Sequence, residues 1–140
     1  MSRAEPRSTP GQINRELRRY GQARHIRPVV ELQGRPGAEP EPEPGDIVID
    51  RPRMSAFHGS PLDTILRNLD ITHLILTWVH TNRSVNTTAR VAADLGYTPI
   101  LVSDATASTT AEAHTGDLRY RFADIATIHD TTTVTGALTA

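Results

Sequence analysis

The residues best suited to chemistry lie at positions 77–84, which read Thr-Trp-Val-His-Thr-Asn-Arg-Ser. They follow the continuous apolar run 73–77, typical of a central strand buried on both faces, and precede a helix predicted over 84–95. In parallel α/β sheets, sites form where a strand ends and the chain turns into the next helix. Backbone N–H groups at the start of that helix can hold an oxyanion. Ser84 is therefore either a nucleophile beside such a site or simply the N-cap of the helix, and its residue type alone favours the cap.

A serine hydroxyl needs a nearby base before it can attack a substrate. His80 in the same turn and Asp50 at the end of an earlier strand could complete a Ser-His-Asp arrangement, although an exposed turn histidine is the simpler interpretation of His80. The chain has no cysteine, which excludes thiol catalysis. The six histidines form no i, i+4 pair, and no Gly-rich phosphate loop follows a strand, so we predict neither a metal nor a cofactor.

The elements that position this turn are predicted from apolar periodicity. We expect strands over 25–32, 46–50, 73–77, 98–102 and 124–128, and helices over 13–23, 61–69, 84–95 and 111–122. Gly96 is expected to end the helix that begins near Ser84. Strands that alternate with helices of this length indicate βαβ units. The sequence thus predicts an α/β domain with three α/β/α layers around a mostly parallel sheet.

Length and composition indicate one small domain. Of the 140 residues, we expect 1–12 to be a disordered lead, 13–130 to be the domain with a Pro/Glu-rich connection at 34–45, and 131–140 to be a flexible tail. A net charge of −1 gives no electrostatic sign of a nucleic-acid or membrane partner. No apolar run approaches the ~18 residues of a membrane span, and the first residues lack a signal-peptide core, so a cytoplasmic protein is expected.

Four segments of the chain follow the pattern of a known family with its spacing intact. They are the strand, turn and helix of residues 76–90, the tripeptide Ser-Ala-Phe at 55–57, residues 94–105 with their Asp-Ala turn, and the closing segment with His114 and residues 122–124. Through these segments, residues 45–128 resemble the isochorismatase-like cysteine hydrolases, a family that includes N-carbamoylsarcosine amidase and nicotinamidase.

The resemblance implies a Rossmann-like α/β/α fold and hydrolysis of an amide or urea C–N bond, or of the vinyl ether of isochorismate. It also implies a site of Asp, Lys and Cys, in which the thiolate attacks. Here Ser84 occupies the cysteine position and Arg51 the lysine position, and no predicted strand precedes Ile13 to supply the Asp. The implied substrate and oxyanion pocket comprises Phe57, Trp78, Val79, His80 and Thr81.

Three hypotheses account for these departures. In the first, the domain binds an amide-like or isochorismate-like small molecule but is catalytically impaired or inactive, because Ser84, Arg51 and Trp78 (where the family has Gly) change the reaction centre together. In the second, it is an active hydrolase with Ser84 as nucleophile and His80 or Asp50 as base. In the third, it is a non-catalytic subunit of a homo-oligomer or of a full-length paralogue, because a sheet without its first strand exposes an edge that invites pairing.

Overall fold

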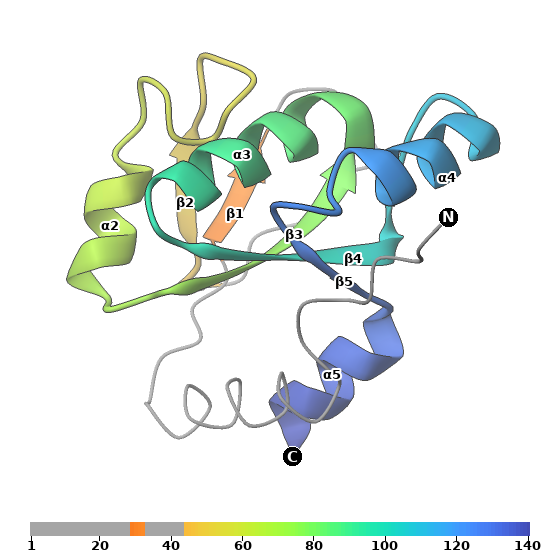
Figure 1. Cartoon of the computed structure of the whole chain (residues 1–140). Coiled ribbons are helices and arrows are strands. Elements are labelled where there is room, and N and C mark those ends of the chain that lie inside the picture. The colour runs from red at the N-terminus through yellow and green to blue at the C-terminus, as the bar shows by residue number, and fades with distance from the viewer. Residues whose placement is uncertain (1–28, 33–43) are drawn as a thin grey trace.

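The computed structural model describes residues 29–32 and 44–140 (Figure 1). The predicted lead, the predicted helix over 13–23 and most of the Pro/Glu-rich connection lie outside these residues. The described elements are β1 (Val29–Leu32), β2 (Ile47–Asp50), α2 (Leu62–Asn68), β3 (His73–Val79), the π-helical turn η1 (Thr81–Val85), α3 (Asn86–Asp94), β4 (Thr98–Ala107), α4 (Ala111–Tyr120), β5 (Thr127–His129) and α5 (Thr131–Thr139). None of these helices is both long and apolar enough to cross a membrane.

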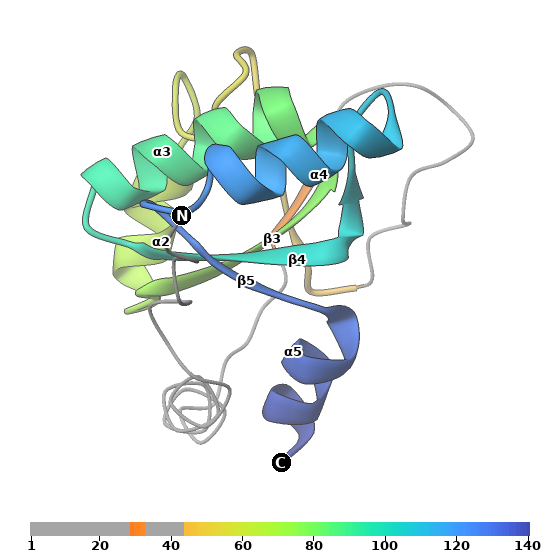
Figure 2. The same cartoon turned by 45° about the vertical axis from the view of Figure 1, so that its right-hand side comes forward.

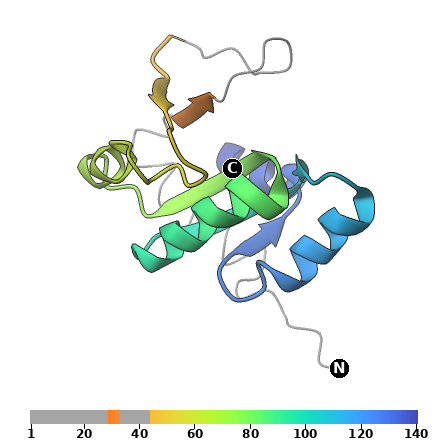
Figure 3. The ribbon, with the colours of Figure 1, turned by 90° about the horizontal axis from the view of Figure 1, so that it is seen from above.

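The strands form two parallel ladders. β1 pairs with β2, and β3, β4 and β5 pair in that order. α2, α3 and α4 lie on one side of the strands and α5 lies on the other (Figures 1 and 2). Seen from above, α3 and α4 lie side by side over the three-stranded ladder, and β1 and β2 lie to one side of it (Figure 3). This arrangement confirms the predicted α/β fold with a parallel sheet between helices.

The central strand of the three-stranded ladder is β4 rather than the predicted run at 73–77. Ile100, Leu101 and Val102 of β4 are 1%, 0% and 3% exposed. β3 pairs only with β4 among the described strands, and its apolar residues Leu74 and Ile75 are only partly buried. Both runs are apolar, so composition alone cannot tell which of the two strands is central. The difference comes from the neighbouring strands, which β4 has on both sides.

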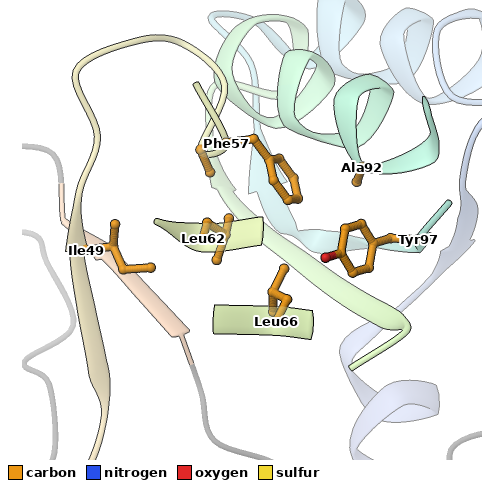
Figure 4. Packing of buried hydrophobic residues seen from close by; sticks show 7 residues of the cluster. Ile49, Phe57, Leu62, Leu66, Ala92 and Tyr97 are labelled. Atoms are coloured by element: carbon orange, nitrogen blue, oxygen red, sulfur yellow. The ribbon is translucent and has the colours of Figure 1, made fainter. Parts of the chain in front are cut away.

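One hydrophobic cluster joins β2 to the helices above the sheet. Figure 4 shows its side chains, contributed by β2, α2, α3 and the two connecting segments: Ile49, Phe57, Leu62, Leu66, Ala92 and Tyr97. The rings of Phe57 and Tyr97 stack with centroids 5.7 Å apart. The Tyr97 hydroxyl donates a hydrogen bond to the carboxylate of Asp63 at 2.5 Å. Burial, helped by this carboxylate, raises the pKa of Tyr97 to about 12.

The chain end forms a helix where the sequence predicts a flexible tail. α5 begins after Asp130, whose carboxylate accepts a hydrogen bond from the Thr133 N–H at 2.7 Å. Its Val134 and Ala137 are buried in a cluster with Ile100 of β4 and with other residues of the sheet. The expectation was wrong because the Thr-rich composition of 131–140 has little helical character by itself. The helix is stabilised by a cap and by packing, and packing is a tertiary effect.

Candidate active site

Ser84 lies in the turn that connects β3 to α3, and this turn is helical from Thr81 onward. The helical segment begins at Thr81, after His80, which has the extended conformation of an N-cap residue. Ser84 is the fourth residue of η1 and is partly exposed. The N-cap interpretation of Ser84 is therefore wrong, because an N-cap residue precedes the helix and has non-helical backbone angles. Single π-helical turns of this kind occur frequently at functional sites.

A hydrogen-bonded histidine fixes the start of the turn. Thr81 is completely buried, and its hydroxyl oxygen lies 3.0 Å from Nδ1 of His114 on α4. The other ring nitrogen of His114, Nε2, lies 2.9 Å from the carbonyl oxygen of Ser103 on β4. A carbonyl can only accept, so Nε2 carries a hydrogen, and in the neutral ring Nδ1 accepts from the Thr81 hydroxyl. The turn is thus tied to both α4 and β4, through a histidine that the sequence indicated only as part of a family segment.

Ser84 lines a cavity of about 460 Å³, a volume within the range of small-molecule sites. The cavity is formed by the loop after β2 and the turn after β3: Arg51, Pro52, Arg53, Met54, His80, Arg83 and Ser84. Three of the residues singled out from the sequence, Ser84, Arg51 and His80, therefore lie around one space. Arg53 and Arg83 were not singled out, although each lies close in sequence to a candidate residue.

Arg51 supports the loop that forms one wall of the cavity. It directly follows β2 and is only 8% exposed. One terminal nitrogen of its guanidinium donates hydrogen bonds to the carbonyl oxygens of Arg53, at 3.0 Å, and of Met54. Burial lowers the pKa of Arg51 below that of a free arginine. A guanidinium nevertheless remains charged at neutral pH, so Arg51 cannot exchange protons as a lysine could.

Of the other predicted residues whose side chains the structure describes, Phe57, Thr81 and Asp50 are not in the lining of this cavity. Phe57, predicted in the pocket, instead packs in the hydrophobic cluster against Tyr97, because its loop is drawn onto α3 by a hydrogen bond from the Ala56 N–H to the Thr88 hydroxyl. The Thr81 side chain is buried against His114. Asp50 is an exposed residue at the end of β2 and is not among the residues that line the cavity. Trp78 and Val79 end β3, and their side chains lie outside the described part of the structure.

The described lining of the cavity is cationic and contains no carboxylate. It provides three arginines, one histidine and one serine hydroxyl, but no Asp, Glu or Cys. His80 Nδ1 is buried and has no hydrogen-bond partner, so it makes no hydrogen bond to the Ser84 hydroxyl. Within the described residues, the cavity therefore offers a hydroxyl and positive charge, without an assembled catalytic triad.

The family follows from comparison with known sequences. The isochorismatase domain profile matches residues 12–133. The chain belongs to the isochorismatase family. The ureidoacrylate amidohydrolase RutB of Enterobacter sp. (strain 638) is 48% identical over 65 residues, which cover 46% of this chain and 28% of that relative. The match thus spans much less than two thirds of the relative.

Solved structures agree with this assignment to the isochorismatase family. An isochorismatase family protein from Burkholderia thailandensis matches with a TM-score of 0.71 at 25% identity, over 91% of this chain and 82% of its own. The pyrazinamidase/nicotinamidase of Streptococcus mutans UA159 matches with a TM-score of 0.58 at 35% identity, over 61% of this chain and 48% of its own. These matches confirm the resemblance inferred from residues 45–128.

Proposed function

We propose that this isochorismatase-family domain binds a small amide- or urea-like molecule in the Ser84 cavity and that its hydrolysis of the C–N bond is strongly impaired. The observation that carries the proposal is the composition of the described cavity lining, which has a serine at the nucleophile position and no carboxylate. The printed activities of the relatives, ureidoacrylate amidohydrolase and nicotinamidase, supply the class of ligand.

The chemistry of Ser84 supports impairment. A serine hydroxyl has a far higher pKa than a cysteine thiol, so it attacks a carbonyl only when a base removes its proton. Arg51 is permanently charged and cannot serve as that base. His80 is the one titratable residue in the described lining that could, and it makes no hydrogen bond to Ser84. We therefore expect the backbone N–H groups of the turn to remain available to a ligand oxygen, without a competent nucleophile beside them.

One observation favours a second candidate function, an active serine hydrolase. His80 lines the same cavity as Ser84, and its buried Nδ1 has no hydrogen-bond partner. Catalytic hydrogen bonds are often long in ligand-free structures and shorten when substrate binds. In this candidate, His80 would accept the Ser84 proton only in the substrate complex.

Ammonia release separates the two functions. The protein and its Ser84→Ala and His80→Ala variants would be incubated with ureidoacrylate, nicotinamide and pyrazinamide. Impairment predicts that all three proteins release ammonia at the same background rate. A rate in the wild-type protein that both substitutions abolish would overturn it and establish the second candidate. Circular dichroism of each variant would show that the fold is retained.

The hypothesis of a non-catalytic subunit is supported by the position of β3 among the described strands. Of these strands, β3 pairs with β4 alone, and a strand at the edge of a sheet can pair with another chain. We propose that the β3 edge contributes to association, either between copies of the chain or with a full-length paralogue. Light scattering of the protein alone and mixed with such a paralogue tests this. A monomer in both samples would refute it.

A further inference from the structure

The chain contains little sulfur, and one of its sulfur atoms belongs to the lining of the Ser84 cavity. The sequence has no cysteine and two methionines, Met1 and Met54. Met1 lies outside the described residues, whereas Met54 lines the cavity from the loop after β2. Of the large apolar side chains that are exposed in the described structure, only Met54 is in this lining. An oxidant that enters the cavity therefore meets a thioether and no thiol.

The side chain of Met54 is accessible, while its backbone is held in place. The residue is 54% exposed. Its carbonyl oxygen accepts a hydrogen bond from the guanidinium of Arg51, which is only 8% exposed. The same loop packs closely on itself, because a Cβ at Gly59 would lie 2.8 Å from Cγ of Pro52. A chemical change in the Met54 side chain is therefore expected to act on the cavity without releasing the loop.

The cavity around this thioether is rich in hydrogen-bond donors. Its lining includes three arginines and no carboxylate. The guanidinium groups of Arg53 and Arg83 form no ion pair, hydrogen bond or ring contact with another described residue. A thioether sulfur is only a weak acceptor for such N–H groups, whereas oxidation to the sulfoxide makes the side chain polar. We therefore expect an oxidised Met54 to accept a hydrogen bond from one of these arginines and to occupy the cavity.

We propose that Met54 is an oxidation site through which hydroperoxides control ligand binding in the Ser84 cavity. The Met54 sulfur attacks one peroxide oxygen as the O–O bond breaks, which oxidises the thioether to the sulfoxide and reduces the hydroperoxide to water or an alcohol. The sulfoxide is reducible, so the modification is reversible. This inference rests on the proposed function, because the ligand whose binding changes is the amide- or urea-like molecule proposed there.

Oxidation with hydrogen peroxide tests the inference. The wild-type protein and Met54→Leu would be treated in parallel, and peptide mapping by mass spectrometry would locate each added oxygen atom. Leucine is apolar and close to methionine in volume but has no sulfur, and Met1 is present in both proteins. Titration calorimetry with nicotinamide and with ureidoacrylate would give the Kd of each protein before and after oxidation. The readout is the ratio of these two Kd values within one protein.

We expect oxidation to raise the Kd of the wild-type protein about tenfold. Treatment with a methionine sulfoxide reductase and dithiothreitol, which becomes a disulfide as the oxygen leaves in water, should restore the original Kd. In Met54→Leu the ratio should stay close to one. Three results would overturn the inference: no sulfoxide at Met54 under conditions that oxidise free methionine, an unchanged Kd after Met54 is oxidised, or an equal rise in Met54→Leu.

The unoxidised samples report separately on the proposed function. Binding of a probe with a Kd that oxidation of Met54 leaves unchanged would refute the oxidation site alone. No binding of either probe by the unoxidised wild-type protein would refute the proposed function and this inference with it. Ser84-dependent release of ammonia would refute the proposed impairment, and a Kd that still rises on oxidation in those samples would support the oxidation site.

Discussion

The chain passes from a strand into a helix at two comparable places, and these junctions are built differently. After β5, Asp130 caps α5 through Thr133, and Asp104 of β4 accepts hydrogen bonds from both the N–H and the hydroxyl of Thr131 at 2.7 Å. After β3, the N-cap residue His80 makes no side-chain cap. Its Nδ1 and the side-chain oxygen of Asn82 are buried without hydrogen-bond partners.

The comparison indicates that the junction after β5 contributes to stability, whereas the junction after β3 is available for ligand binding. A buried polar atom without a partner costs about 1–3 kcal/mol. Such a cost in stability is retained where the local structure binds a ligand. Natural proteins leave buried polar groups without hydrogen-bond partners mostly at functional sites. At the junction after β5, the N–H groups of Thr131 and Thr133 have hydrogen-bond acceptors. At the junction after β3, buried polar atoms near the cavity have no hydrogen-bond partner.

Removing the Thr81–His114 hydrogen bond of the β3 junction should have the largest effect. Thr81→Val deletes the hydroxyl that donates to His114 and leaves Nδ1 of that ring unpaired. We expect a loss of about 1–3 kcal/mol in the free energy of unfolding, measured by urea denaturation. Thr115→Val on the exposed face of α4 is the control and should cost less. Equal losses would mean that the Thr81–His114 bond does not anchor the turn.

The cap of α5 should contribute a smaller but pH-dependent amount. Hydrogen bonds from Thr133 lower the pKa of Asp130, and those from Thr131 lower the pKa of Asp104. A lowered carboxyl pKa stabilises the fold above the unfolded value of 3.8, and this stability is lost as the pH falls through the folded value. Asp130→Ala should therefore lower the Tm at neutral pH and lose less on acidification. An unchanged Tm would show that α5 does not need its cap.

His129 makes the comparison sharper, because the β5 junction is not fully satisfied either. This residue is 8% exposed, its Nε2 lacks a partner, and burial lowers its pKa below 6.5, with Asp130 opposing part of the shift. The neutral ring is thus favoured in the fold, so its stability is present above about pH 6.5 and lost as the pH falls. Between about pH 7.5 and 5.5 the Tm should fall more in the wild-type protein than in His129→Gln. Parallel curves would contradict this.

The smallest effect is expected where the β3 junction already lacks a hydrogen bond. Asn82→Ala removes a buried oxygen that has no partner, so no protein hydrogen bond is lost. The free energy of unfolding should stay within about 0.5 kcal/mol of the wild-type value or rise. A loss comparable with that of Thr81→Val, measured in the same urea titrations, would mean that the two junctions do not differ in the way described.

The sequence predicts the parts of the fold that depend on local pattern. The apolar runs locate the strands, although β4 continues to Ala107 beyond the predicted 98–102, and β5 covers Thr127–His129 where 124–128 was predicted. Gly96 ends α3 with a positive φ of 90°, as its position predicts. What it does not predict depends on distant partners. β4 is central because of its neighbours, and α5 packs on Ile100 of β4, while its first residue, Thr131, donates to Asp104, 27 residues away in the chain.

The same division applies to the site. Residues around Ser84 identify the family because strand, turn and helix are contiguous in sequence. The convergence of Arg53 and Arg83 on one cavity joins two separate loops, and nothing in either loop alone indicates it. The place of Phe57 was predicted wrongly for a related reason, since an aromatic residue suits a pocket and a core equally well and only the packing against Tyr97 decides.

The most direct test of the central claim is the reactivity of Ser84 itself. The protein and Ser84→Ala would be treated with a fluorophosphonate, a reagent that labels base-activated serines, and analysed by intact-mass spectrometry and peptide mapping. Because no base is hydrogen-bonded to the Ser84 hydroxyl, we expect no adduct on either protein. A stoichiometric adduct on Ser84, lost in Ser84→Ala, would contradict the account and show that a base reaches the hydroxyl.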